Sequence, residues 1–196
     1  MSVDSATPYV SDDRGVTTRG ETDVRGVVIP LPAPGERLLT VLTEWELIDD
    51  GQHPYSVDLA RPWEPATCTD PGLRGELWEW LDQFVSWVNE QCLWDPGDVI
   101  PPCWPHHPHL VHELAVLAVQ RLQASRTPTA SALEQWQTHT LPAFLNRSHT
   151  RLRRHCDTDH QPTPAGTAHT RHQSGPETTA RQVAFEKDLA TEAAVT

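Results

Sequence analysis

Cysteine and histidine are concentrated in one short stretch of this 196-residue chain. The stretch begins at Cys103 and reads Cys-Trp-Pro-His-His-Pro-His-Leu-Val-His-Glu. Thiolate and imidazole are ligands that zinc prefers, and a short loop lets a cysteine and a nearby histidine reach the same ion. We therefore consider a zinc site that contains Cys103, His106, His107 and, from further along the chain, Cys156.

The rest of such a site is harder to assign from the sequence. The further ligands would come from Cys92, or from a group near residue 150 that comprises His149, His155 and Cys156. We find no second short-spaced pair of ligands, and the spacings of known zinc fingers do not fit. The preferred interpretation therefore needs no cofactor and treats the histidines as packing and capping residues. A structural or catalytic zinc ion is the alternative.

Sequence signatures of common enzymes are missing. In the H-E-x-x-H motif, two histidines one helical turn apart bind zinc beside a glutamate base. Here His112-Glu113 would need a second histidine at the position of Val116. The glycine-rich phosphate-binding and dinucleotide-binding loops and the G-x-S-x-G nucleophile motif are also absent from the sequence. We therefore expect a protein without enzymatic activity.

Basic residues form a single cluster, shortly before Cys156. On a helix, the steps of four and three residues would align Arg147, Arg151 and Arg154. With Arg153 they would form a ridge that contacts phosphates, so we consider a nucleic-acid contact here. The alternative is that these cations stabilise the C-terminal end of a helix through its dipole.

Eight tryptophans are many for a chain of this length. Most should be buried, because large aromatic side chains contribute much apolar area to a core. Trp78 and Trp87 widen the apolar stripe of their predicted helix. We consider these two side chains a surface for a protein partner.

Charge and composition limit the classes of protein. The net charge is −12, but residues 101–156 contain six basic and two acidic residues. The acidic whole argues against general coating of nucleic acid. The longest purely apolar run, Leu114 to Val119, is far shorter than the roughly 20 residues that span a bilayer. With no signal peptide and no C-x-x-C pair, we expect a cytoplasmic protein with no membrane contact and free thiols.

The fold class expected is mainly α: a small three- to four-helix domain with disordered N- and C-terminal tails. Residues 1–26 have no apolar period and are expected to be disordered. Residues 27–69 form a poorly defined extended or helical segment that packs on the core, with a helix over 36–49 or a hairpin through Tyr55, Val57 and Leu59. The helical domain covers 70–156. Residues 157–196 form a disordered tail with a short helical end near Arg181 to Leu189.

Helix signals divide the central domain. Asp70-Pro71 provides an N-cap and a first-turn proline, and this helix should end before Asp95. A proline-rich loop follows over residues 96–108, and a second helix runs from there to Thr127-Pro128. The third helix begins with a capping box, Ser131 to Glu134. Pro142 should break or kink it before a fourth helical segment.

The order of these residues resembles an uncharacterised domain family of high-GC Gram-positive bacteria (actinobacteria), which occurs on plasmids, phages and conjugative elements. The resemblance covers about residues 73–156. This sequence departs from the family pattern at two positions. One tryptophan is displaced and stands at Trp104, and His109 stands where the family has an acid. It rests on Cys103, His107-Pro108, Leu114, Leu117, Trp136, His139, Leu145 and Cys156.

The resemblance implies a setting, an accessory protein of a mobile genetic element, and no reaction. The function expected is therefore that of a non-enzymatic helical interaction protein. It would contact a protein partner and, through the arginine ridge, nucleic acid. The alternative is a zinc-binding protein.

Overall fold

The computed structural model describes residues 28–54, 56, 58–152, 155–156, 159–161 and 175–195. Within these ranges the chain forms helices and no strand, as the sequence predicts. The N-terminal segment that is predicted to be disordered, residues 1–26, lies outside the described residues. The helices are α1 (Glu36–Asp49), α2 (Pro71–Gln91), α3 (Pro108–Arg126), α4 (Ser131–Gln135), α5 (Leu141–Leu152) and α7 (Gly175–Val195).

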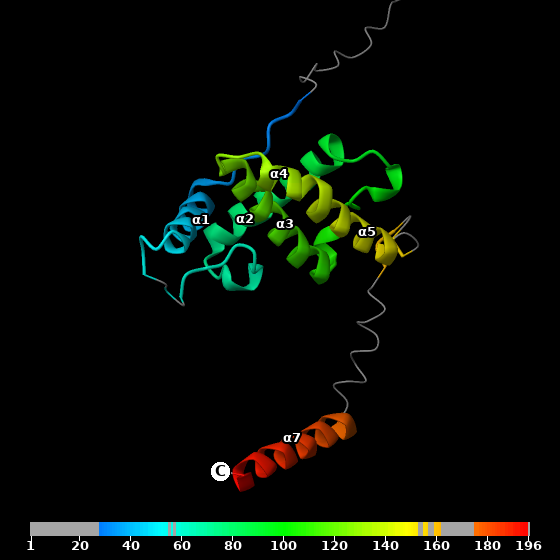
Figure 1. Cartoon of the computed structure of the whole chain (residues 1–196). Coiled ribbons are helices and arrows are strands. Elements are labelled where there is room, and N and C mark those ends of the chain that lie inside the picture. Colours follow the sequence, from blue (N-terminus) through cyan, green and yellow to red (C-terminus); the bar gives the residue numbers. More distant parts are fainter. Residues whose placement is uncertain are drawn as a thin grey trace, which may run out of the picture.

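Short helical turns join the long helices. Three are 3-10 turns: η1 (Pro65–Thr67), η2 (Pro96–Asp98) and η3 (Trp104–His106). The fourth, η4 (Trp136–Thr140), is a π-helical turn. Figure 1 shows α1 at one end of the bundle and the C-terminal end of α5 at the opposite end.

The core extends into residues before position 70. Leu38 and Leu42 of α1 are buried against the bundle. The extended residues before α1 are held by two tryptophans of α2. The indole N–H of Trp80 donates to the Pro32 carbonyl at 3.0 Å, and that of Trp87 donates to the Ile29 carbonyl at 2.9 Å. In the hairpin alternative, Tyr55 and Val57 lie outside the described residues.

Helices α2 and α3 supply most of the core, and both begin as the sequence predicts. The Asp70 carboxylate accepts a hydrogen bond from the Leu73 amide at 2.8 Å, so it caps α2, and Pro71 takes a first-turn position. Pro108 opens α3 in the same way. The largest fully buried side chains of the two helices are Trp80, Phe84, Leu77, Leu81, Leu110 and Leu114.

The chain continues without a break through α4, the π turn and α5, so of the two predicted effects of Pro142, a break or a kink, the break does not occur. In a regular α-helix the ring of Pro142 would clash with the carbonyl of residue 138. The wider turn just before it, in which the Leu141 amide donates to the Trp136 carbonyl five residues earlier, shifts the register there. The predicted capping box is also not formed, because Ala130 is the N-cap and the Ser131 hydroxyl pairs with that of Thr129 at 2.9 Å.

The last described helix, α7, is longer than the short helical end that we predict near Arg181 to Leu189. It lies within residues 157–196, which we predict to be a disordered tail. Among its described side chains, Val183 and Phe185 are exposed. In the part of the chain that the structure describes, no helix has the length and apolar character needed to cross a bilayer.

Candidate metal centre

Four cysteine and histidine side chains meet where the proline-rich loop passes the end of α5. Their ligand atoms lie within 4.8 Å of one another. Two come from the loop and two from the residues after α5, so the group joins segments about 50 positions apart in the sequence. Such a Cys2His2 group could hold a metal ion. The four residues, which we call the Cys2His2 group, are Cys103, His107, Cys156 and His160.

The loop positions its two ligands through a buried anchor and a helix start. Trp104, next to Cys103, is buried and its ring lies 5.8 Å from that of Trp78 on α2. Pro108 fixes the start of α3, so His107 occupies the N-cap position. Its side chain makes no capping hydrogen bond and is fully buried, which leaves its ring free to face the two sulfurs.

The other pair is brought back to the loop by a tight turn after α5. The amide of Cys156 bonds to the Leu152 carbonyl at 3.3 Å, so the chain leaves the helix by a turn. The amide of Gln161 then approaches the Cys156 sulfur at 3.5 Å. This return places the ring of His160 at 4.8 Å from that of His107, centroid to centroid.

The distances from His107 to the two sulfurs are close to those of a tetrahedral ion, whereas the group as a whole, with ligand atoms up to 4.8 Å apart, would have to contract around the metal. Zinc–sulfur and zinc–nitrogen bonds of about 2.3 and 2.0 Å imply ligand–ligand distances of roughly 3.3–3.8 Å. The Nε2 atom of His107 lies 3.2 Å from the Cys156 sulfur and 3.5 Å from the Cys103 sulfur. The Nδ1 atom of the same ring is buried and has no hydrogen-bond partner among the described residues. Nε2 is therefore the atom of His107 that would bind.

Burial and neighbouring groups shift the pKa of two of the ligands, Cys103 and His107. Burial raises the pKa of the Cys103 thiol, and the adjacent thiol of Cys156 raises it further. Burial lowers the pKa of His107, and the nearby rings of His160 and His109 act in the same direction. At neutral pH His107 is thus a neutral imidazole, the form that binds metals. A metal ion would have to displace the proton of Cys103.

Three of the four residues that the sequence suggests as ligands belong to the group. The fourth, His106, does not: it is exposed on η3, with its ring 5.0 Å from that of His160. Cys92 and His149, which we considered as further ligands, are also outside it. His149 instead bonds through Nδ1 to the Gly97 carbonyl at 2.9 Å.

Sequence reasoning missed His160, and a signal for it was present. Cys103 and His107 are four positions apart, and so are Cys156 and His160. The sequence therefore does contain a second short-spaced pair of ligands, contrary to our interpretation of it. The second pair escaped notice because it straddles the predicted domain boundary at residue 156, in a polar stretch without an apolar period.

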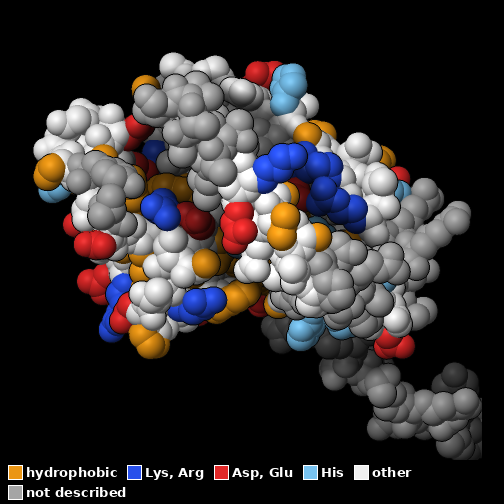
Figure 2. All heavy atoms as spheres, turned by 90° about the horizontal axis from the view of Figure 1, so that it is seen from below, with side chains coloured by type: hydrophobic (Ala, Val, Ile, Leu, Met, Phe, Trp, Pro, Cys, Tyr) orange, Lys and Arg blue, Asp and Glu red, His pale blue; other side chains and the backbone are white. Residues whose placement is uncertain are grey.

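The predicted arginine ridge is partly neutralised in the structure. Arg147 and Arg151 both bind Glu113 of α3, with nitrogen–oxygen distances of 2.8 and 2.6 Å. Arg153 and Arg154 lie outside the described residues. In Figure 2, one group of Lys and Arg side chains stands out on the face seen from below, with acidic side chains close to it. The nucleic-acid contact stays a prediction.

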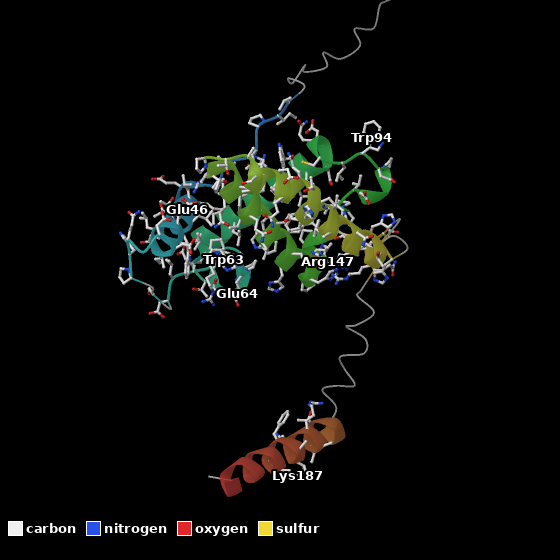
Figure 3. The ribbon with its side chains drawn as sticks, viewed as in Figure 1. Glu46, Trp63, Glu64, Trp94, Arg147 and Lys187 are labelled. Atoms are coloured by element: carbon white, nitrogen blue, oxygen red, sulfur yellow. The ribbon has the colours of Figure 1, made fainter. Side chains whose placement is uncertain are left out.

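The two tryptophans that we considered a protein interface are half-buried at the edge of the core. Trp78 packs on Trp104, and Trp87 lies beside Phe84 at 6.1 Å while its N–H bonds to the Ile29 carbonyl. The tryptophan that is fully exposed is Trp94, in the loop after α2. Figure 3 shows it pointing away from the bundle.

No protein-family model, curated protein or solved structure matches this chain. The resemblance to an actinobacterial domain family therefore rests on the residues quoted for it. The fold and the site define the class: a helical protein with a Cys2His2 group that could bind a metal ion.

Proposed function

We propose that this protein binds one zinc ion through Cys103, His107, Cys156 and His160, and that the ion has a structural role. The observation that supports the proposal is the convergence of two Cys-x-x-x-His pairs, from distant parts of the sequence, within 4.8 Å. Four protein ligands fill a tetrahedral shell and leave no open position for a substrate, which is typical of structural zinc. The ion would fasten the residues after α5 to the proline-rich loop.

The test is metal analysis of the full chain without a tag, purified and then loaded with zinc. We expect about one zinc per chain, and a lower melting temperature after chelation, because a ligand that binds only the folded state stabilises it. Cobalt substitution should give the thiolate-to-cobalt and d–d absorption bands of a tetrahedral site with sulfur ligands.

Matched variants make this test specific. Cys103→Ser and Cys156→Ser should lose the metal and the cobalt spectrum, whereas Cys92→Ser and His112→Ala should keep both. Cys92 lies outside the Cys2His2 group, and His112 is an exposed histidine on α3. Equal metal content in all four variants, or no stoichiometric metal in the parent, would refute the proposal.

The second candidate is the interaction role that the sequence suggests, and exposed Trp94 favours it. A cavity of about 550 Å³ lies beside this side chain, lined by apolar residues that include Leu93, Leu141 and Leu145. Asp95 and Asp98 also line it. Apolar walls with carboxylates beside them suit a peptide that presents one large apolar side chain between lysines or arginines.

Labelled peptides test this second candidate directly. A peptide with leucine or phenylalanine between basic residues should bind, and the same peptide with glutamates should not. Trp94→Ala should weaken binding by about 2 kcal/mol, the usual loss at an aromatic hot spot. Val116→Ala, at another exposed apolar residue, is the matched control. Equal binding of both peptides would contradict the proposed surface.

A further inference from the structure

The two cysteines of the Cys2His2 group form a thiol pair in their own right. Both are free thiols and both are partly exposed. Their sulfurs lie within 4.8 Å of each other and share one neighbour, the Nε2 atom of His107, at 3.5 and 3.2 Å. Cys68, in contrast, is fully buried, and neither it nor Cys92 belongs to the group.

The backbone around each cysteine lies outside the long helices. Cys103 precedes η3, and Cys156 sits in the turn after α5. A disulfide needs a sulfur–sulfur distance of about 2.05 Å. The sulfurs therefore have to approach each other by less than about 3 Å, and side-chain rotation with a small shift of the turn can supply this without unwinding a helix.

A small oxidant also has a route to the pair. A cavity of about 480 Å³ is lined by Cys156, by Pro101 and Pro102 of the loop, and by Ser148 of α5. This cavity is large enough for a small peroxide to reach the Cys156 side chain.

We propose that Cys103 and Cys156 are a reversible oxidation site, in which a hydroperoxide converts the two thiols to a disulfide and so removes both sulfur ligands from the metal. The disulfide step depends only on the geometry of the thiol pair. The loss of metal rests on the proposed function above. The site would thus hold zinc when reduced and release it when oxidised.

The chemistry balances with hydrogen peroxide as the oxidant. One thiol loses its proton, the thiolate so formed attacks a peroxide oxygen, the O–O bond breaks, and sulfenic acid and hydroxide form. The second thiolate attacks the sulfenic sulfur, the S–O bond breaks, and the S–S bond forms with loss of a second hydroxide. Each sulfur gives up one electron and the peroxide accepts two. The two protons that the thiols lose convert the two hydroxides to water.

The first experiment uses the full chain without metal, treated with hydrogen peroxide, alkylated, digested with trypsin and analysed by mass spectrometry. Cys156 lies in the tryptic peptide 155–171, whereas Cys92 and Cys103 share the peptide 75–121. The Cys92→Ser variant therefore assigns the link without ambiguity. We expect one intramolecular disulfide between the two peptides, which dithiothreitol reverses.

Substitution of one partner separates this site from general oxidation. In Cys103→Ser the link should be lost, and the remaining thiol of Cys156 should stop at sulfenic acid, which dimedone traps. Links that involve Cys68 or Cys92 in the parent would overturn the proposal. So would oxidation to sulfinic acid without a disulfide, or disulfides only between chains.

The second experiment loads the protein with zinc and follows zinc release with a chromogenic indicator during peroxide treatment. Release in step with disulfide formation supports both the oxidation site and the proposed function. A disulfide in a protein that never binds zinc supports the thiol pair and refutes the proposed function. In a third outcome the protein binds zinc stably and forms no disulfide, even when the metal-free protein is treated with peroxide. This result refutes the oxidation site and leaves the zinc proposal intact.

Discussion

At the residue scale, Glu113 is the acidic residue that joins α3 to α5. Its two carboxylate oxygens bind Arg147 and Arg151 separately, and the carboxylate is three-quarters buried. Burial alone would raise its pKa, but the hydrogen bonds and charges of the two arginines outweigh burial and lower it. The arginine ridge that the sequence suggests for nucleic acid is therefore, for these two residues, an intramolecular contact.

The lowered pKa of Glu113 predicts a specific pH dependence of stability. A carboxylate whose pKa is lower in the folded than in the unfolded state stabilises the fold above its unfolded pKa, about 4.3. This stabilisation is lost as the pH falls through the folded value. Glu113→Gln should thus lower the free energy of unfolding by about 1 kcal/mol at pH 7, since both arginines are half exposed. At pH 3 the variant and parent should be nearly equal.

Urea unfolding at the two pH values measures the difference. Glu90→Gln, at an exposed glutamate of α2, controls for the loss of a negative charge and should show little change at either pH. If Glu113→Gln destabilises the protein equally at pH 3 and pH 7, the ion pairs are not the cause.

At the element scale, the position of α1 tests whether the helical domain begins at residue 70 or earlier. Leu38 is fully buried, whereas its neighbour Leu39 is 37% exposed. Leu38→Ala should destabilise the protein by about 2–5 kcal/mol, the usual cost of a leucine-to-alanine cavity in a core. Leu39→Ala should cost much less. Urea unfolding of the two variants makes the comparison, and equal, small effects would show that α1 is not part of the cooperative core.

The elements were predictable where a local signal governs them. The Asp70 cap, the first-turn prolines and the spacing of Leu38 and Leu42 act within one or two helical turns, so the sequence alone predicts where α1, α2 and α3 start. The π turn before Pro142 was not predictable in this way. Its register depends on how Trp136 and Leu141 both reach the core, where they are buried, and this is a tertiary constraint.

In the candidate site, too, some features follow from a local sequence signal and others depend on tertiary packing. Cys103, His107 and Cys156 were predictable from residue type, because few other roles bring thiols and histidines so close together. His160 required the observation that both pairs have the same spacing. The partner of Arg147 and Arg151 was not predictable, because Glu113 is 34 and 38 positions away from them and only the packing of α5 on α3 brings the three side chains together.

At the scale of the whole molecule, the two ends of the bundle are stabilised by different means. At one end, apolar side chains of α1 and the indole hydrogen bonds of Trp80 and Trp87 fasten the residues before position 50. At the other end, around the C-terminal end of α5 (Figure 1), loops carry many prolines and few buried apolar side chains. The Cys2His2 group lies at this second end, where a metal ion would replace the missing apolar contacts.

This asymmetry predicts where zinc should reduce motion. Amide hydrogen exchange, compared with and without zinc, should slow most in residues 101–107 and 148–161, because the ion suppresses local opening there. Amides of α1 that exchange by local opening should change little, since no ligand lies near them. At a free zinc concentration 100 times the dissociation constant, global stability should rise by about 2.7 kcal/mol. Protection spread evenly over the chain, or retained in Cys103→Ser, would show that zinc binds elsewhere.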